Sequence, residues 1–224
     1  MSGRAGRGVA LALAVAVAWL PAAAQGVRAT SLRGSRGAGV VNIPTADGGV
    51  ARQFTAGLHV AGGSPVYSYL RYQLTDELEL GGVVSPADQV GAPDTSRVGL
   101  LAHYRFLKEQ GALPAMAVGI EGLSGYVVAS HSLPGPRYLR AHLGGRVGER
   151  AGLFAGVSAV VNPVTVRRPG ALATPVVTLG MDFDGATLNA GATLQWGPGV
   201  QVDVGVMDRG YLALATGINI SAIF

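Results

Sequence analysis

The chain has 224 residues, enough for one domain of moderate size; 49% of them are hydrophobic and only 13% are charged. An average soluble domain has about 25% charged residues, so this composition is unusual for a protein whose whole surface meets water. Cysteine is absent, which excludes disulfides, thiolate chemistry and cysteine-based metal sites. The formal charge is +4, with no basic patch interleaved with aromatic residues, so nucleic acid is not an expected partner.

The first 24 residues predict a cleaved secretory signal peptide. Arg4 and Arg7 give a positively charged start, residues 9–20 are apolar, and small residues follow, with cleavage expected after Ala24. The apolar run is shorter than the ~20 residues that a helical membrane span needs, although a membrane anchor is the alternative interpretation. Without the two leader arginines the net charge falls to about +2.

Residues 25–52 form a lead-in segment that we assign to the periplasm. Its part GVVNIPTADGG, residues 39–49, shows no clear hydrophobic periodicity. Pro44 removes a backbone donor and holds the chain extended. We therefore expect either an ordered segment, in the periplasm or tucked into the mouth of the following domain, or a flexible linker.

From Gln53 to Phe224 most segments alternate apolar and polar residues with a period of two, and Gly, Pro, Asp or Asn separate them. The clearest strands are 53–61, 97–106, 139–147, 186–196, 200–207 and the final run that ends at Phe224; the weaker ones are 66–74, 77–85, 114–122, 125–132, 152–161 and 175–184. About twelve strands of roughly ten residues match the strand length of a membrane barrel.

The chemistry of the two strand faces favours an all-β fold with a single antiparallel transmembrane β-barrel over residues 53–224. One face carries Leu, Val, Ala and aromatics, whereas the other is small, glycine-rich and sparsely polar, as a lipid-facing and a lumen-facing side would be. Aromatics near predicted strand ends fit interfacial girdles: Tyr72, Tyr104, Phe106, Phe183, Trp196, Tyr211 and Phe224. A soluble secreted β-sandwich is the alternative, because it also alternates.

The run YLALATGINISAIF, residues 211–224, ends on an aromatic. In a soluble domain this apolar edge would invite aggregation. In a closed barrel it is the last strand, and a terminal Phe224 resembles the signal that the outer-membrane barrel assembly machinery reads.

The strand pattern places balanced charges on the inner face. The lumen-facing polar candidates are Arg71, Glu79, His103, Arg105, Glu121, Arg140, His142, Arg146, Asp182 and Asp203. All four histidines, including His59 and His131, fall in or near inward positions. These side chains predict either a plugged lumen, in which Arg and carboxylate groups pair, or a polar channel. Equal numbers of acidic and basic groups argue against strong ion selectivity.

No catalytic arrangement is predicted, and we expect neither enzyme activity, nor a cofactor, nor a metal. A barrel hydrolase would need a nucleophile activated by a base, with Ser130, His131 and His142 as candidates. Ser130 and His131 are sequence neighbours, so on a strand they point to opposite faces. The chain has no G-x-S-x-G elbow and no pair of ligands at metal-binding spacing.

The stretch GVVNIPTA at residues 39–46, followed by Phe54 and Gly57, resembles the start of the YjbH-like outer-membrane barrel family. Residues 112–130, ALPAMAVGIEGLSGYVVAS, are similar to its middle section, and GLFAGV (152–157) and NAGATLQW (189–196) also fit. This chain is short for the family, whose members often have long additional regions.

The resemblance implies a bacterial outer-membrane protein that supports exopolysaccharide production or cell-envelope assembly, and it implies no catalytic residues. The expected partners are outer-membrane lipid and lipopolysaccharide, the barrel assembly machinery and envelope or polysaccharide-export proteins. A narrow pore for small polar solutes is the alternative function. One connection conflicts with a typical barrel: the long loop 162–174 falls on the periplasmic side, where turns are normally short, unless a strand boundary near 161–170 is misplaced.

Overall fold

The computed structural model describes residues 40–61, 67–85, 97–135, 138–148, 151–163, 174–196, 200–207 and 211–221. It contains twelve strands: β1 Gln53–Ala61, β2 Tyr67–Gln73, β3 Leu78–Ser85, β4 Arg97–Leu107, β5 Ala115–Glu121, β6 Ser124–Ser132, β7 Leu139–Val147, β8 Gly152–Asn162, β9 Val176–Phe183, β10 Leu188–Trp196, β11 Val200–Met207 and β12 Tyr211–Ser221. Within these residues, no helix is long and apolar enough to cross a membrane. The predicted signal peptide and Phe224 lie outside the described residues.

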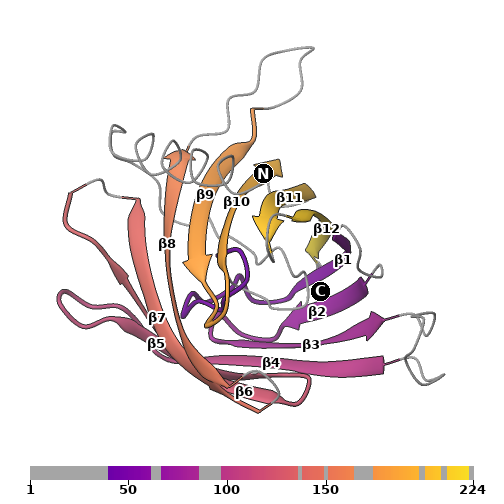
Figure 1. Ribbon diagram of the computed structural model, residues 1–224, viewed down its shortest axis with the longest axis horizontal. Coiled ribbons are helices and arrows are strands. Elements are labelled where there is room, and N and C mark those ends of the chain that lie inside the picture. Colours follow the sequence, from indigo (N-terminus) through magenta and orange to yellow (C-terminus); the bar gives the residue numbers. More distant parts are fainter. Residues whose placement is uncertain are drawn as a thin grey trace, which may run out of the picture.

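The twelve strands form one closed barrel in which each strand pairs antiparallel with its sequence neighbours (Figure 1). Closure comes from β1 and β12, which pair along their length from Gln53↔Ser221 to Ala61↔Ala213. The predicted fold class is therefore confirmed, and the alternative of a two-sheet sandwich is wrong. Closure leaves no free sheet edge, which removes the aggregation risk of the apolar last strand.

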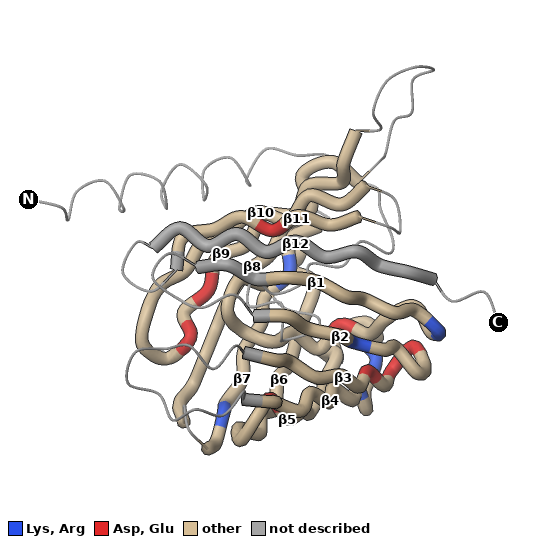
Figure 2. The backbone as a smooth tube through the Cα atoms, turned by 90° about the vertical axis from the view of Figure 1, so that its right-hand side faces the viewer, with Lys and Arg blue, Asp and Glu red and all other residues tan. Residues whose placement is uncertain are grey.

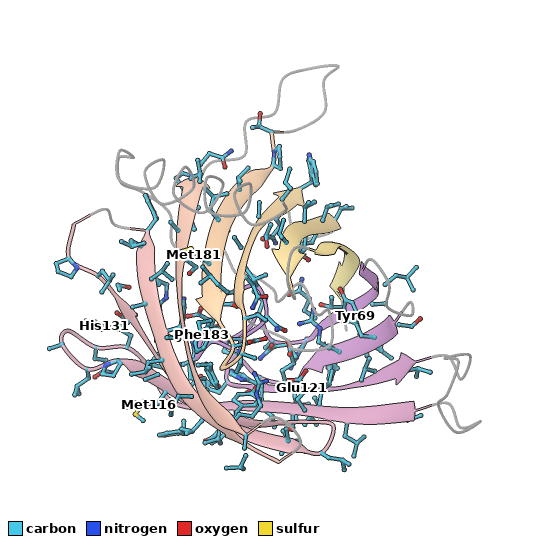
Figure 3. All side chains as sticks on the ribbon, viewed as in Figure 1. Tyr69, Met116, Glu121, His131, Met181 and Phe183 are labelled. Carbon is cyan, nitrogen blue, oxygen red and sulfur yellow. The ribbon has the colours of Figure 1, made fainter. Side chains whose placement is uncertain are left out.

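The two faces of the wall differ as the period of two predicts. On β7, Leu143 and Val147 are exposed on the outside, whereas His142 and Arg146 are buried on the inside. On every strand whose side chains are described, the large apolar side chains that are exposed lie at outward-facing positions. They are Leu58, Leu70, Leu80, Val84, Val98, Leu100, Tyr104, Phe106, Val118, Ile120, Val127, Leu143, Val147, Leu153, Phe183, Leu188, Val200, Val204 and Val206. Figure 3 shows Met116, another residue of this face, outside the wall.

Aromatic and charged side chains mark the end of the barrel at which β1 begins. The rings of Phe54 and Tyr72 pack with centroids 4.3 Å apart, and Tyr104 and Phe106 are exposed at the same end of β4. Lys, Arg, Asp and Glu gather at the β2–β4 end, where the loops 74–77 and 108–114 lie, while most of the strand wall lacks them (Figure 2).

The connections are unequal in length. Only two residues join β5 to β6, and Gly122 there has φ 59°, a conformation that favours glycine. In contrast, β8 ends at Asn162 and β9 begins at Val176, within one or two residues of the predicted boundaries, so the long connection is not an error of strand placement. The Asn162 side chain joins the two ends of this long connection: it donates to the Pro175 carbonyl and accepts from the Val177 N–H, both at 2.6 Å.

Residues 40–49 lie inside the barrel, before β1 begins (Figure 1, indigo). Val40, Val41, Ile43 and Ala46 are buried and form one apolar cluster with inward side chains of β5, β6 and β8, namely Ala115, Ala117, Val128 and Phe154. The described core of this protein is thus made between the inner wall and the segment that precedes the barrel.

Phe154 packs over Gly144 on the neighbouring strand, where a Cβ would collide with its ring and with the Val127 carbonyl. We expect Gly144→Val to lower the free energy of unfolding by about 1–3 kcal/mol, because overpacking forces the ring and backbone to shift. Urea unfolding of the detergent-solubilised protein, followed by Trp196 fluorescence, measures this change.

The matched control is Gly145→Val on the outer face of the same strand, where the closest side-chain atom to a Cβ, Leu153 Cδ2, is 3.6 Å away. It should leave the midpoint nearly unchanged. Equal effects of the two variants would contradict the assignment of faces.

Candidate functional site

The candidate site is the barrel interior where residues 40–49 meet the inner wall of β5–β9. Two glycines let the segment approach the wall closely. A Cβ at Gly156 would lie 2.8 Å from Ile43 Cδ1, and one at Gly180 would lie 2.6 Å from Val40 Cγ1. Any larger residue at either position would displace the segment, so the wall of β8 and β9 is shaped for it.

Asp182 on β9 holds the first part of the segment. Its Oδ2 atom accepts hydrogen bonds from the backbone N–H groups of Val41, Asn42 and Ile43, at 2.8, 2.6 and 3.3 Å. Three successive N–H groups that converge on one anion form a concave site of the kind that binds phosphates elsewhere. Here the anion is the protein's own carboxylate, and its side chain is 1% exposed.

Two further side chains complete this contact. Asn189 Nδ2 donates to Asp182 Oδ1 at 2.9 Å, which orients the carboxylate toward the segment. The Asn42 side-chain amide donates to Asp184, in the turn after β9. The Asn42 amide and backbone therefore both bind the same hairpin, and this gives a physical role to the Asn in the Asn-Ile-Pro-Thr-Ala stretch.

A buried chain of hydroxyl and imidazole groups holds the middle of the segment. The Ala46 N–H donates to Ser130 Oγ at 2.8 Å. Ser130 Oγ in turn lies 2.8 Å from His142 Nδ1, and His142 Nε2 lies 2.9 Å from Ser158 Oγ. The chain spans β6, β7 and β8, so it ties three strands to one backbone group of the segment.

Arg140 at the start of β7 holds the end of the segment. Its Nη2 lies 3.0 Å from Asp47 Oδ1, and its Nη1 lies 2.7 Å from Glu109 Oε2. Glu109 belongs to the connection between β4 and β5 and also accepts from the Ser132 N–H at 2.7 Å. Asp47, Arg140 and Glu109 thus link the segment, the wall and a loop.

The surroundings of Glu109 lower its pKa. Partial burial raises the pKa, but the hydrogen bonds from the Ser132 N–H and from Arg140 outweigh that effect and leave the pKa below the usual value. A lowered folded-state pKa means that this stabilisation is present above the unfolded-state value and is lost as the pH falls through the folded-state value. The link is therefore intact at neutral pH.

A second set of polar side chains lies on the inner surface of β2, β3, β10 and β11. Arg71, 3% exposed, lies 3.7 Å from Glu79 and 5.0 Å above the Tyr69 ring. On the other strands, Asp203 accepts from Thr193 Oγ1 at 2.6 Å and from Gln201 Nε2 at 2.8 Å. The charged groups of this cluster therefore each lie beside a polar or oppositely charged neighbour within the wall.

The remaining predicted residues have separate environments. Arg146 is buried with its guanidinium 5.5 Å from the Phe154 ring, and His103 Nδ1 lies 3.0 Å from the Tyr126 hydroxyl. Arg105 reaches the Asp76 carbonyl at 3.2 Å at the barrel end, and Glu121 is half-buried at the tight β5–β6 turn.

One prediction about the histidines is wrong. His131 pairs with Ala141 on the outward face of β6 and β7 and lies 3.1 Å from Glu109, whereas its neighbour Ser130 points inward. The strand alternation forces this outcome. The side chain of His59 lies outside the described residues. Among the described residues, no cluster of three or more potential ligands could hold a metal ion.

Sequence reasoning did not find that Ser130, Ser158, Gly156 and Gly180 serve the segment. Small residues at these positions fit any inner barrel wall, so their type carried no signal. Ser130, His131 and His142 are all candidates in the sequence, but local alternation decides only on the Ser130–His131 pair. The contact of Ser130 with His142 depends on the pairing of β6 with β7.

No family model matches the chain, and no curated protein matches it. Among solved structures, a KdgM porin has a TM-score of 0.47 and 9% identity, and a KdgM porin in complex with disordered oligogalacturonate has a TM-score of 0.46 and 12% identity; each alignment covers 76% of this chain and 99% of the porin. The barrel architecture itself rests on the strand pairing described above.

We expect Asp182→Ala to loosen the start of the segment. Each buried N–H left without an acceptor costs about 1–3 kcal/mol, and three are affected. Hydrogen exchange at the amides of residues 41–43 should accelerate at least about a hundredfold, because 1.4 kcal/mol is a factor of ten.

Asp182→Asn retains an acceptor oxygen and should show a smaller acceleration. Asp203→Asn, an equally buried carboxylate on β11, serves as the matched control and should leave these amides unchanged. Unaltered exchange in Asp182→Ala would refute the role of Asp182.

Proposed function

We propose that this chain is a bacterial outer-membrane β-barrel whose interior is closed at rest by its own residues 40–49. The observation that carries the proposal is the outer wall, where large apolar side chains are exposed on successive strands around the barrel. A monomeric soluble protein rarely exposes such a continuous apolar surface, whereas a bilayer requires it. The hydrogen-bonded closure of β1 on β12 supplies the second requirement, because lipid cannot satisfy a free edge.

The contacts of residues 40–49 support a closed resting state. The segment is bound at its start by Asp182, in its middle by Ser130 and at its end by Arg140. A flexible linker that passed through the lumen would not have buried backbone N–H groups paired at Asp182 and Ser130 and an ion pair at its end. The interpretation as a plugged lumen therefore has more support than that of an open channel.

A narrow pore for small polar solutes is the second candidate function. It is favoured by the polar side chains on β2, β3, β10 and β11, which line the inner wall away from the apolar cluster. These groups would keep any water-filled path hydrated.

The cellular role that we propose is support of exopolysaccharide production or envelope assembly through partners. It depends on the resemblance of the stretch at 39–46 and of the section at 112–130 to YjbH-like barrels. The proposed partners are outer-membrane lipid and lipopolysaccharide, the barrel assembly machinery, which would read Phe224, and envelope or polysaccharide-export proteins.

Leu143→Arg tests whether the outer wall faces lipid. Leu143 lies at the middle of β7 and is 63% exposed. At the bilayer midplane an Arg costs about 2–4 kcal/mol, whereas an exposed substitution on a soluble protein changes stability by about 0.5 kcal/mol or less. We expect a clear fall in stability in lipid vesicles, measured by urea titration, and a much smaller one for Leu143→Ala. If Leu143→Arg left the stability in urea titration unchanged, the result would argue for a soluble barrel.

Assembly is tested by heat-modifiability. The full chain, expressed in a Gram-negative host, should fractionate with the outer membrane and migrate faster on a gel when unheated than when boiled. Deletion of Phe224 should reduce this folded form. A soluble periplasmic protein with no shift would overturn the proposed function, and unchanged assembly without Phe224 would remove only the proposed signal.

The cellular role is tested by deleting the gene and measuring surface polysaccharide. We expect less exopolysaccharide, restored by the wild-type chain but not by the Leu143→Arg variant. Unchanged polysaccharide and an intact envelope would reject this role and leave the barrel assignment standing.

A further inference from the structure

The number of strands determines how much space the barrel must fill. Eight strands enclose an interior that side chains alone can fill, and sixteen to eighteen leave an aqueous channel. This barrel has twelve strands, and many of its inward residues are small, including Gly156, Gly180, Ala117 and Ser130. Residues 40–49 occupy the space that such small residues leave.

Polar contacts hold the segment at its two ends, in addition to the apolar cluster and the Ser130 contact between them. Asp182 binds three backbone N–H groups at the start, and Arg140 binds Asp47 at the end. Neither contact belongs to a strand ladder, so both can break while every strand pair of the wall stays intact. The hydrogen bonds that hold the segment are thus independent of those that pair the strands.

The wall behind the segment carries polar side chains beside the apolar cluster of Ala115, Ala117, Val128 and Phe154. Release of residues 40–49 would uncover Ser130, His142 and Asp182, all of which are polar and inward, alongside a few apolar side chains. The buried Arg71 and Arg146 are matched in number by Glu79, which lies beside Arg71, and by the buried Asp203. The uncovered path would accept small ions with little preference for sign.

We propose that residues 40–49 are an autoinhibitory plug and that release of the Asp182 and Arg140 contacts turns the barrel into a pore for small ions. This inference rests on the proposed outer-membrane barrel and adds its regulation. Asp182 and Arg140 are the two latches, the carboxylate for the backbone of residues 41–43 and the guanidinium for Asp47.

The test is single-channel recording in planar bilayers, with potassium chloride as the probe. The wild-type barrel should be silent, and the double variant Asp182→Ala with Arg140→Met should show discrete conductance steps. Asp203→Asn with Lys108→Met, which alters a buried carboxylate and an exposed cation outside the latches, is the matched control and should stay silent.

A disulfide lock makes the test reversible. The chain has no cysteine. A Cβ at Gly180 would lie 2.6 Å from Val40 Cγ1, which places the Cβ atoms of the two positions within the roughly 3.5–4.5 Å that a disulfide requires. Val40→Cys with Gly180→Cys, added to the latch variant, should abolish the steps when oxidised and restore them when reduced.

The heat shift of each sample separates the two levels of the proposal. Absence of the shift in the wild-type chain would reject the barrel itself. A latch variant that shifts but stays silent, or steps that persist with the oxidised lock, would overturn the plug. If the latch variant fails to assemble, the wild-type barrel is recorded in stepwise urea. Conductance steps should then appear at urea concentrations at which the heat shift persists, and they should be absent when Val40→Cys and Gly180→Cys alone are introduced and oxidised. Silence of the wild-type barrel up to unfolding would overturn the plug.

Discussion

Closure of β1 on β12 is the constraint on which the rest of this structure depends. It satisfies the backbone of every strand within the wall, and it divides each strand into one outward and one inward series of side chains. The outward series can then be almost entirely apolar. The inward series must satisfy its own polar groups, which explains why Arg71 lies beside Glu79 and why Asp203 is bound by Thr193 and Gln201.

The same closure creates the space that residues 40–49 occupy. Asp182 illustrates the energetic logic, since a carboxylate at this depth would be costly without donors. Its donors are three consecutive backbone N–H groups, which themselves would be costly to bury unpaired. The carboxylate and the N–H groups therefore each remove the cost of burying the other, and together with the apolar contacts of the segment they hold it in the lumen.

The fold was predictable from the sequence because its signal is local. Alternation within each strand located the ends of the twelve elements to within one or two residues, apart from the last end, which was expected at Phe224, outside the described residues. It also placed His142 and Arg146 inside and Leu143 outside. The contacts of the segment were not predictable, because they depend on register between distant strands. Asn42 and Asp182 are 140 residues apart, and nothing in either local pattern indicates that they meet. His131 shows the opposite error: alternation with Ser130 places it on the outer face, yet the sequence-based prediction counts it among histidines in or near inward positions.

The position of the segment also bears on why the stretch at 39–46 has its composition. Asn42 uses its backbone for Asp182 and its amide for Asp184, and Ile43 fills the space over Gly156. Pro44 follows with no N–H to satisfy, and the buried N–H of Ala46 donates to Ser130. Each residue type thus solves a problem posed by a dry, narrow interior. A stretch selected only as a linker would face none of these problems, so its composition is better explained by residence in the barrel than by passage to it.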